Sequence, residues 1–276
     1  MSISAAEVNK LRQMTGAGLM DCKQALSENN GDFEAAIDFL RKKGAKIAAK
    51  RADREATEGA VIAKTNGDGT VGVVIVLSCE TDFVAKNEGF VSFAHEIADT
   101  ALSHKPATAD ALKALTVGSA SLEARLMEEV AKIGEKIDVV KYEIIEGANL
   151  VAYIHGANRM GVLVELSNSP SDANIAAGKD VAMQIAAMNP VAVDKDGVDA
   201  TTIERELEIG REQARQEGKP EAMIDKIAEG KLQKFYKEST LLNQEFVKDS
   251  SKTVGAMLSS VETGLTVKQF KRVQLG

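Results

Sequence analysis

Apolar residues at the beginning of the chain recur with the i, i+3, i+4 spacing of amphipathic helices. Three such stripes lie within residues 1–44, and Ser4 and Glu7 have the spacing of a capping box at the start of the first. We predict three short helices, each ended by a glycine: Gly16, Gly31 and Gly44. Three helices of this length bury little surface, so they fit a small docking module better than a catalytic domain.

The pattern changes to β-branched runs from residue 59. The runs 59–64 and 72–79 flank Asn66-Gly67-Asp68-Gly69, which is a strong hairpin signal. The elements predicted next are two helices and a third strand: 88–103, 122–133 and 137–145.

The same order of elements recurs after residue 148. Strands predicted over 150–155 and 161–166 form a second hairpin, and 161–167 matches 72–78 in Gly, Val, Leu and Ser at the same offsets. The following helices also align with one gap, and 267–275 is the counterpart of the third strand. We interpret this as an internal duplication within an α+β fold, with two α/β subdomains that contain small antiparallel sheets.

An insertion over about 200–237 interrupts the second copy. It predicts two antiparallel helices joined by a turn at Gly218-Lys219-Pro220, that is, a helical hairpin. The predicted facing positions are Ile203, Leu207, Gly210 and Ala214 on one helix and Ile224, Ile227, Lys231 and Phe235 on the other. This seam either packs between its own two arms or holds another subunit, and the pattern favours the two interpretations equally.

The composition is typical of a globular protein and argues against several kinds of partner. The 276 residues are 44% hydrophobic and 27% charged, and the net charge of −7 argues against a chain-wide surface for nucleic acid or anionic lipid. Cys22 and Cys79 form no C-x-x-C pair, which fits a reducing, cytoplasmic location. We expect no secretion signal and no membrane span, because no basic leader or long apolar run occurs.

Residues 41–54 are the one strongly basic stretch, with seven basic residues against one acid, Asp53. A solvated linker helix explains it most simply, because basic side chains are favourable near a helix C-terminus. The alternative is a contact with RNA or an acidic partner, as in a ribosome- or RNA-associated adaptor.

The chain shows no signature of an enzyme. Residues 67–72 match G-x-G-x-x-G, but a strand and not a helix follows, so a hairpin turn is expected there. His95, His104 and His155 lack metal-ligand spacing, and no nucleophile motif occurs. We therefore expect no catalysis, no metal and no cofactor.

The sequence Glu80-Thr81-Asp82-Phe83-Val84 directly follows a strand whose apolar run predicts that it is buried. Thr81-Asp82 can simply start a helix. Phe83, placed beside an acid in a tight connection, is either a core residue or an exposed wedge for a partner.

Several strings resemble the elongation factor Ts family, the bacterial guanine-nucleotide exchange factors for elongation factor Tu. The most specific are T-G-A-G-L-M-D-C-K at 15–23 and T-D-F-V-A-K at 81–86, with Ser251-Lys252-Thr253-Val254-Gly255 near the end. The resemblance covers nearly the whole chain. It implies a domain similar to ubiquitin-associated domains with its basic linker over 1–54, a core over 55–147 and 148–276, and a protruding hairpin used in dimerisation.

The resemblance also implies partner contacts. Thr81, Asp82, Phe83 and Val84 would enter elongation factor Tu beside its Mg²⁺ and phosphate site. The residues that match contacts with other parts of that partner are Arg12, Leu19 and Met20 for a helix of the nucleotide domain, and His155 and Gly156 for a second domain. The expected partner is elongation factor Tu, either GDP-bound or nucleotide-free. We expect no contact with a membrane and no direct contact with nucleic acid. Whether the helical hairpin forms a homodimer is left open, because its sequence is not diagnostic.

Overall fold

The computed structural model describes residues 3–118 and 120–276, and the chain divides into two compact units. Unit 1 comprises residues up to 62, residues 73–144 and residues 274–276, and unit 2 comprises residues 63–72 and 145–273. Residues 1 and 2, where the predicted N-terminal domain begins, lie outside the described part. In that part, no helix is both long and apolar enough to cross a membrane.

Three helices open unit 1, as the apolar stripes predict: α1 (Ala5–Thr15), α2 (Leu19–Glu28) and α3 (Phe33–Arg51). The capping box is present, because Glu7 N–H donates to Ser4 Oγ at 3.2 Å and Ser4 N–H donates to Glu7 Oε2 at 2.8 Å. The three helices enclose a small core of their own, which includes Val8, Leu11 and Leu26.

The prediction that Gly44 ends the third helix is wrong, because α3 continues to Arg51. Gly44 is buried where α3 packs on α7 (Leu122–Ile133). A Cβ at this position would lie 2.8 Å from the Ala131 Cβ and 2.9 Å from the Met127 carbonyl oxygen. The glycine therefore permits close helix packing, which a local sequence pattern does not distinguish from a helix stop.

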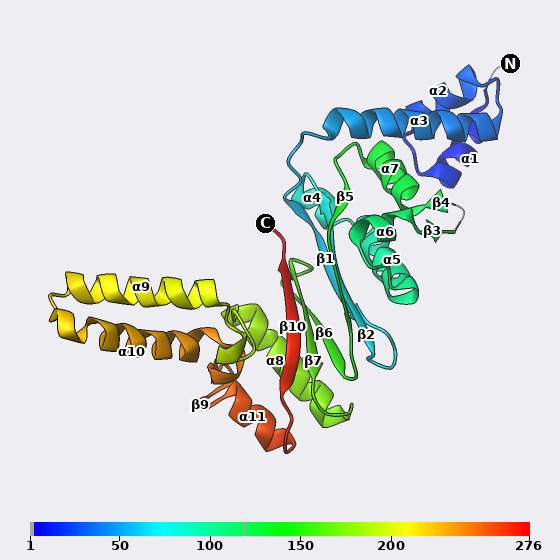
Figure 1. Cartoon of the computed structure of the whole chain (residues 1–276). Coiled ribbons are helices and arrows are strands. Elements are labelled where there is room, and N and C mark those ends of the chain that lie inside the picture. Colours follow the sequence, from blue (N-terminus) through cyan, green and yellow to red (C-terminus); the bar gives the residue numbers. More distant parts are fainter. Residues whose placement is uncertain (1–2, 119) are drawn as a thin grey trace. The chain divides into compact units, whose positions relative to one another are not determined.

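The first sheet has the order β1-β2-β5, formed by β1 (Glu58–Thr65), β2 (Val71–Cys79) and β5 (Asp138–Glu146) (Figure 1). All nine residues of the central strand β2 are buried. The predicted hairpin turn is confirmed, with Asn66 Oδ1 accepting from the backbone N–H groups of Thr70 and Val71 at 2.9 Å each. The remaining elements between β2 and β5 are α4 (Asp82–Ala85), α5 (Glu88–His104), α6 (Ala109–Ala114), the antiparallel pair β3 (Thr116–Val117) and β4 (Ala120–Ser121), and α7.

Unit 2 contains a second sheet of order β10-β7-β6, formed by β6 (Leu150–His155), β7 (Met160–Leu166) and β10 (Val267–Gln274). In both sheets, the second strand of a hairpin lies in the centre and pairs on its far side with a strand much later in the chain. This common order is what the internal repeat predicts. The other elements of the unit are α8 (Asp172–Met188), which packs on β6 and β7, two short 3₁₀ helices (Lys195–Gly197 and Leu241–Asn243), β8 (Glu245–Phe246), β9 (Asp249–Thr253) and α11 (Val254–Val261).

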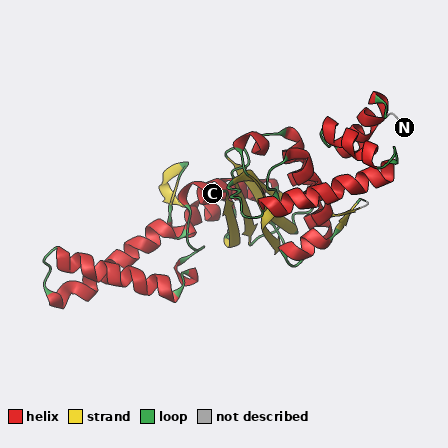
Figure 2. Cartoon of the chain, turned by 90° about the horizontal axis from the view of Figure 1, so that it is seen from above, coloured by secondary structure: helices red, strands yellow, loops and turns green. Residues whose placement is uncertain are grey.

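Two long helices, α9 (Ala200–Gln216) and α10 (Glu221–Ser239), lie side by side (Figure 1 and Figure 2). Gly210 packs against Ala228, and the ion pair Arg211–Asp225 joins the two helices at 2.8 Å. The buried residues between them are Gly210, Ala214, Ile224, Ala228 and Leu232. Of the predicted facing positions, Gly210, Ala214 and Ile224 are buried, whereas Ile203, Leu207, Ile227, Lys231 and Phe235 are half-buried. Lys231 Nζ donates to Gln213 Oε1 on α9 at 2.8 Å. The prediction missed Ala228 and Leu232, which are buried.

Candidate functional site

The segment after β2 forms a single helical turn between a buried strand and a long helix. β2 ends at Cys79, and Thr81 is the N-cap of the four-residue helix α4, with Val84 N–H donating to Thr81 Oγ1 at 3.4 Å. Asn87 then caps α5 through its side-chain oxygen. Two capping side chains within seven residues explain why the chain turns here instead of continuing as one helix.

Phe83 projects from this turn into solvent with 83% of its surface exposed, the largest exposed fraction of any large hydrophobic residue in the described part of the chain. Phe90 and Phe93, on the adjacent helix α5, are 1% and 6% exposed. The interpretation of Phe83 as a core residue is therefore wrong, because the side chain is exposed.

Asp82 lies at the first position of the same turn and pairs with Lys86 one turn later, at 2.6 Å. The hydrogen bond from Lys86 lowers the pKa of the Asp82 carboxyl below its ordinary value. The segment thus presents an ionised carboxylate beside an exposed aromatic ring.

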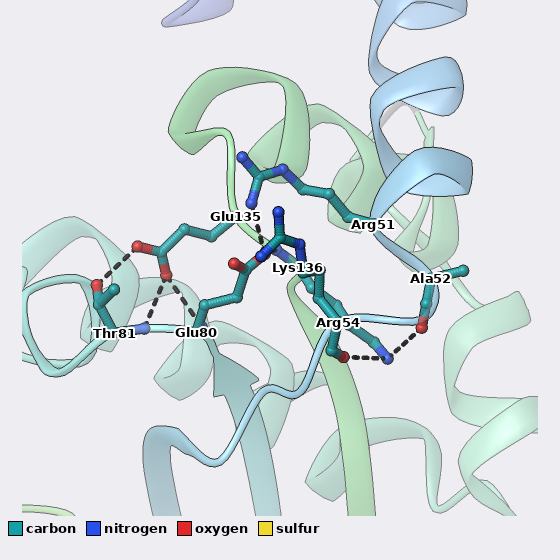
Figure 3. A network of polar contacts seen from close by, with 7 residues as sticks. All are labelled: Arg51, Ala52, Arg54, Glu80, Thr81, Glu135 and Lys136. Atoms are coloured by element: carbon teal, nitrogen blue, oxygen red, sulfur yellow. Dashed lines mark hydrogen bonds and ion pairs between the residues drawn. The ribbon is translucent and has the colours of Figure 1, made fainter.

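Glu135 holds the base of this turn from a distant part of the sequence (Figure 3). Its carboxylate accepts from the backbone N–H groups of Glu80 and Thr81, each at 3.0 Å, and from Thr81 Oγ1 at 2.6 Å. Glu135 directly follows Gly134, which ends α7 in the left-handed region at φ +80°. The left-handed glycine turns the chain between α7 and β5 so that the next side chain reaches the segment.

Glu80 makes the reciprocal connection. Its carboxylate accepts from the Lys136 backbone N–H at 2.7 Å and pairs with Arg51, at the end of α3, at 2.7 Å. The Lys136 N–H is the main reason that the pKa of Glu80 is lowered, and Arg51 adds to it. Lys136 Nζ in turn donates to the carbonyl oxygens of Ala52 and Arg54 at 2.6 and 3.0 Å (Figure 3).

Sequence reasoning included Glu80 in the segment that it singled out but gave it no role, and it missed Glu135 and Arg51 as parts of the site. These residues are separated by tens of positions in the chain, and no local periodicity connects them. In the sequence, Gly134-Glu135 follows the amphipathic helix predicted over 122–133. A glycine in that place indicates the end of a helix but no contact with residues 80–81.

Cys79 is fully buried, as expected of a small residue at a strand end, and its Sγ donates to the Thr81 carbonyl oxygen at 3.2 Å. Burial, together with the negative charge of Glu135, raises the pKa of the Cys79 thiol to about 12. The thiol therefore stays protonated and acts as a hydrogen-bond donor, not as a nucleophile.

The other predicted contact residues lie on three further elements. Arg12 on α1 and Leu19 and Met20 on α2 are all exposed, the last by 70%. Met14, which the sequence analysis did not single out, adds an exposed apolar side chain at the end of α1. In unit 2, His155 and Gly156 begin the β6–β7 turn, where His155 Nδ1 lies 2.9 Å from the Tyr153 hydroxyl and Gly156 has φ +62°.

The basic stretch is partly neutralised inside unit 1. Arg41 pairs with Glu128 at 2.9 Å, Lys43 with Asp21 at 2.8 Å and Arg51 with Glu80. The exposed lysines on the same helix are Lys42, Lys46 and Lys50. Within residues 3–118 and 120–276, no group of three or more His, Cys, Asp or Glu side chains is arranged to hold a metal ion.

Comparison with known proteins identifies relatives along the whole chain. The family model described as Elongation factor TS matches residues 80–276. Elongation factor Ts of Amoebophilus asiaticus is 52% identical over 276 residues, covering 100% of both chains. The proteins of that name from Cytophaga hutchinsonii and Porphyromonas gingivalis are 52% and 46% identical and cover at least 99% of both chains.

Proposed function

Because the chain belongs to the elongation factor Ts family, we propose that it promotes GDP release from elongation factor Tu by inserting residues 81–84 beside the Mg²⁺ and phosphate site of that partner. The family implies a translation elongation factor that exchanges guanine nucleotide on elongation factor Tu. The insertion is the step that we propose for this chain.

The observation that carries the proposal is the exposure of Phe83. A phenylalanine that is 83% exposed gains little from folding, whereas aromatic anchors contribute strongly when a partner buries them. The ionised Asp82 beside it can disturb the charges that hold a metal and phosphates together, while Phe83 occupies space in the partner's pocket.

Linkage explains how such a contact promotes exchange. A protein that binds nucleotide-free elongation factor Tu more tightly than the GDP-bound form must weaken GDP binding by the same factor. No covalent bond is made or broken by this chain, so it is an exchange factor and not an enzyme.

The remaining contacts are assigned by the same family resemblance. We propose that the N-terminal helices form a domain similar to ubiquitin-associated domains and grip a helix of the nucleotide domain through Arg12, Leu19 and Met20. His155 and Gly156 would contact a second domain of elongation factor Tu. The α9–α10 hairpin is the candidate surface for a homodimer, and the setting is the cytoplasm, where translation takes place.

The test is the release of labelled GDP from elongation factor Tu in the presence of excess unlabelled GDP. Substoichiometric amounts of this protein should accelerate release, with each molecule serving many molecules of elongation factor Tu. An unchanged release rate at saturating protein would exclude the proposed function.

A further inference from the structure

We propose that Glu135 is the positioning residue of the exchange segment: its carboxylate fixes the backbone from which Asp82 and Phe83 project. This inference rests on the proposed function, because it assigns to Glu135 the orientation of the side chains that enter the partner. It concerns a residue 54 positions from Thr81 in the chain, outside the motif that carries the family resemblance.

The first argument is the completeness of the contact. Glu135 accepts three hydrogen bonds, and two of them occupy the backbone N–H and the hydroxyl of Thr81. The Thr81 carbonyl accepts from Cys79 Sγ and from Ala85 N–H. Every hydrogen-bonding group of Thr81 is therefore engaged, and its orientation sets the direction in which α4 leaves β2.

The second argument is the limited burial of the turn itself. α4 has four residues and none of them is buried. An isolated helical turn of this length is not stable in water, since nucleation costs more than a few hydrogen bonds return. Only Val84 and Ala85 provide partly buried apolar surface on α4, so the polar contacts at its base contribute to holding it.

The third argument is that the connection is reciprocal. Glu135 binds the backbone N–H of Glu80, and Glu80 binds the backbone N–H of Lys136. Two neighbouring residues of one loop thus hold two neighbouring residues of the other. Because the carboxylates are charged, each of these bonds is stronger than a bond between neutral groups.

Loss of the carboxylate should loosen the segment before it meets the partner. A disordered segment must then be ordered during insertion, and that entropic cost opposes the exchange step. The other contact surfaces of the protein do not depend on Glu135, so binding to elongation factor Tu should change less than the maximal exchange rate does.

The experiment compares Glu135→Ala, Glu135→Gln and Thr81→Val with the unaltered protein. Stimulated GDP release is measured over a range of protein concentrations, which separates the maximal rate from the half-saturating concentration. For Glu135→Ala we expect a roughly tenfold lower maximal rate, equivalent to about 1.4 kcal/mol, with less than a threefold change in the half-saturating concentration. Glu135→Gln keeps the shape and one acceptor oxygen, so its rate should be intermediate.

Two further measurements distinguish positioning from general damage. The double variant Glu135→Ala/Thr81→Val should be much less impaired than the product of the two single effects, because both changes remove the same contact. Hydrogen exchange of the backbone amides at residues 80–84 should be faster in Glu135→Ala, while that of β2 is unchanged. Glu123→Ala, which removes an exposed acid on α7, is the matched control and should behave as the unaltered protein.

The outcomes separate the two proposals. If Phe83→Ala slows exchange but Glu135→Ala and Glu135→Gln do not, the positioning role of Glu135 is wrong. If Phe83→Ala leaves exchange unchanged, the insertion proposal is wrong, and amide exchange at residues 80–84 still tests whether Glu135 orders the segment. Should Glu135→Ala fail to fold, the folded Glu135→Gln and Thr81→Val proteins decide the question by the same rates and amide exchange.

Discussion

Truncation of Phe83 to alanine separates a contact residue from a structural one. A fully buried phenylalanine loses about 3 to 5 kcal/mol on truncation to alanine. Since 83% of Phe83 is exposed, only about a sixth of that cost applies, so the free energy of unfolding should fall by less than about 1 kcal/mol. The melting temperature should therefore fall by no more than about 4 °C.

The effect on exchange should be much larger. An aromatic anchor typically contributes about 2 kcal/mol or more to an interface, and at about 1.4 kcal/mol per tenfold change this is a factor of roughly thirty. We therefore expect Phe83→Ala to slow stimulated GDP release from elongation factor Tu at least tenfold. If the ring acts as a wedge against bound nucleotide, affinity for the nucleotide-free partner should fall less than the exchange rate does.

Phe90→Ala is the matched control, because Phe90 lies seven residues later on α5 and is 1% exposed. It should lose stability in the range of a core phenylalanine, and exchange by the fraction that remains folded should stay close to normal. A large fall in melting temperature for Phe83→Ala, with near-normal exchange at low temperature, would refute the reasoning.

Two further predictions concern the scaffold around the site. Gly44→Ala should lower the free energy of unfolding by about 1 to 3 kcal/mol, because the new Cβ would overlap α7 at Ala131 and Met127. This loss should exceed the gain from the better helix propensity of alanine. Urea unfolding measures the change, and a more stable variant would contradict the close packing. Because the pKa of Glu80 is lowered in the folded protein, its stabilising contribution is present above its unfolded value near pH 4.5 and is lost as the pH falls through the lower folded value. As the pH falls from about 6 to about 3.5, the melting temperature of Glu80→Gln should therefore fall less than that of the unaltered protein. If the two proteins lose melting temperature equally over this range, the contacts of Glu80 with Lys136 and Arg51 add no stability.

Local patterns predicted the longer helices and strands, because those elements are determined by nearby residues. The short elements α6, β3, β4, β8, β9 and α11 were not predicted. The helix over 122–133 has the predicted limits, and the strand that ends at Cys79 was recognised from its β-branched run. The internal repeat predicted more, since two copies of one strand–strand–helix order must form sheets of the same strand order.

The contacts that build the candidate site could not be predicted in this way. Whether Phe83 lies in the core or in solvent depends on how the chain turns after β2, and that turn is held by Glu135. Nothing in the local sequence of either segment indicates that they meet. Gly44 illustrates the same difficulty, because a buried helix contact and a helix end both favour glycine.

The strand order of the second sheet also has a consequence for synthesis of the chain on the ribosome. β7 is complete at Leu166, but its partner β10 begins only at Val267. One edge of β7 must therefore remain unpaired while residues 167–266 are translated, and this non-local pairing is a slow type of contact to form. The helices α9 and α10 lie within that interval and contact each other over a short sequence distance. They can therefore fold before β10 is synthesised and completes the sheet.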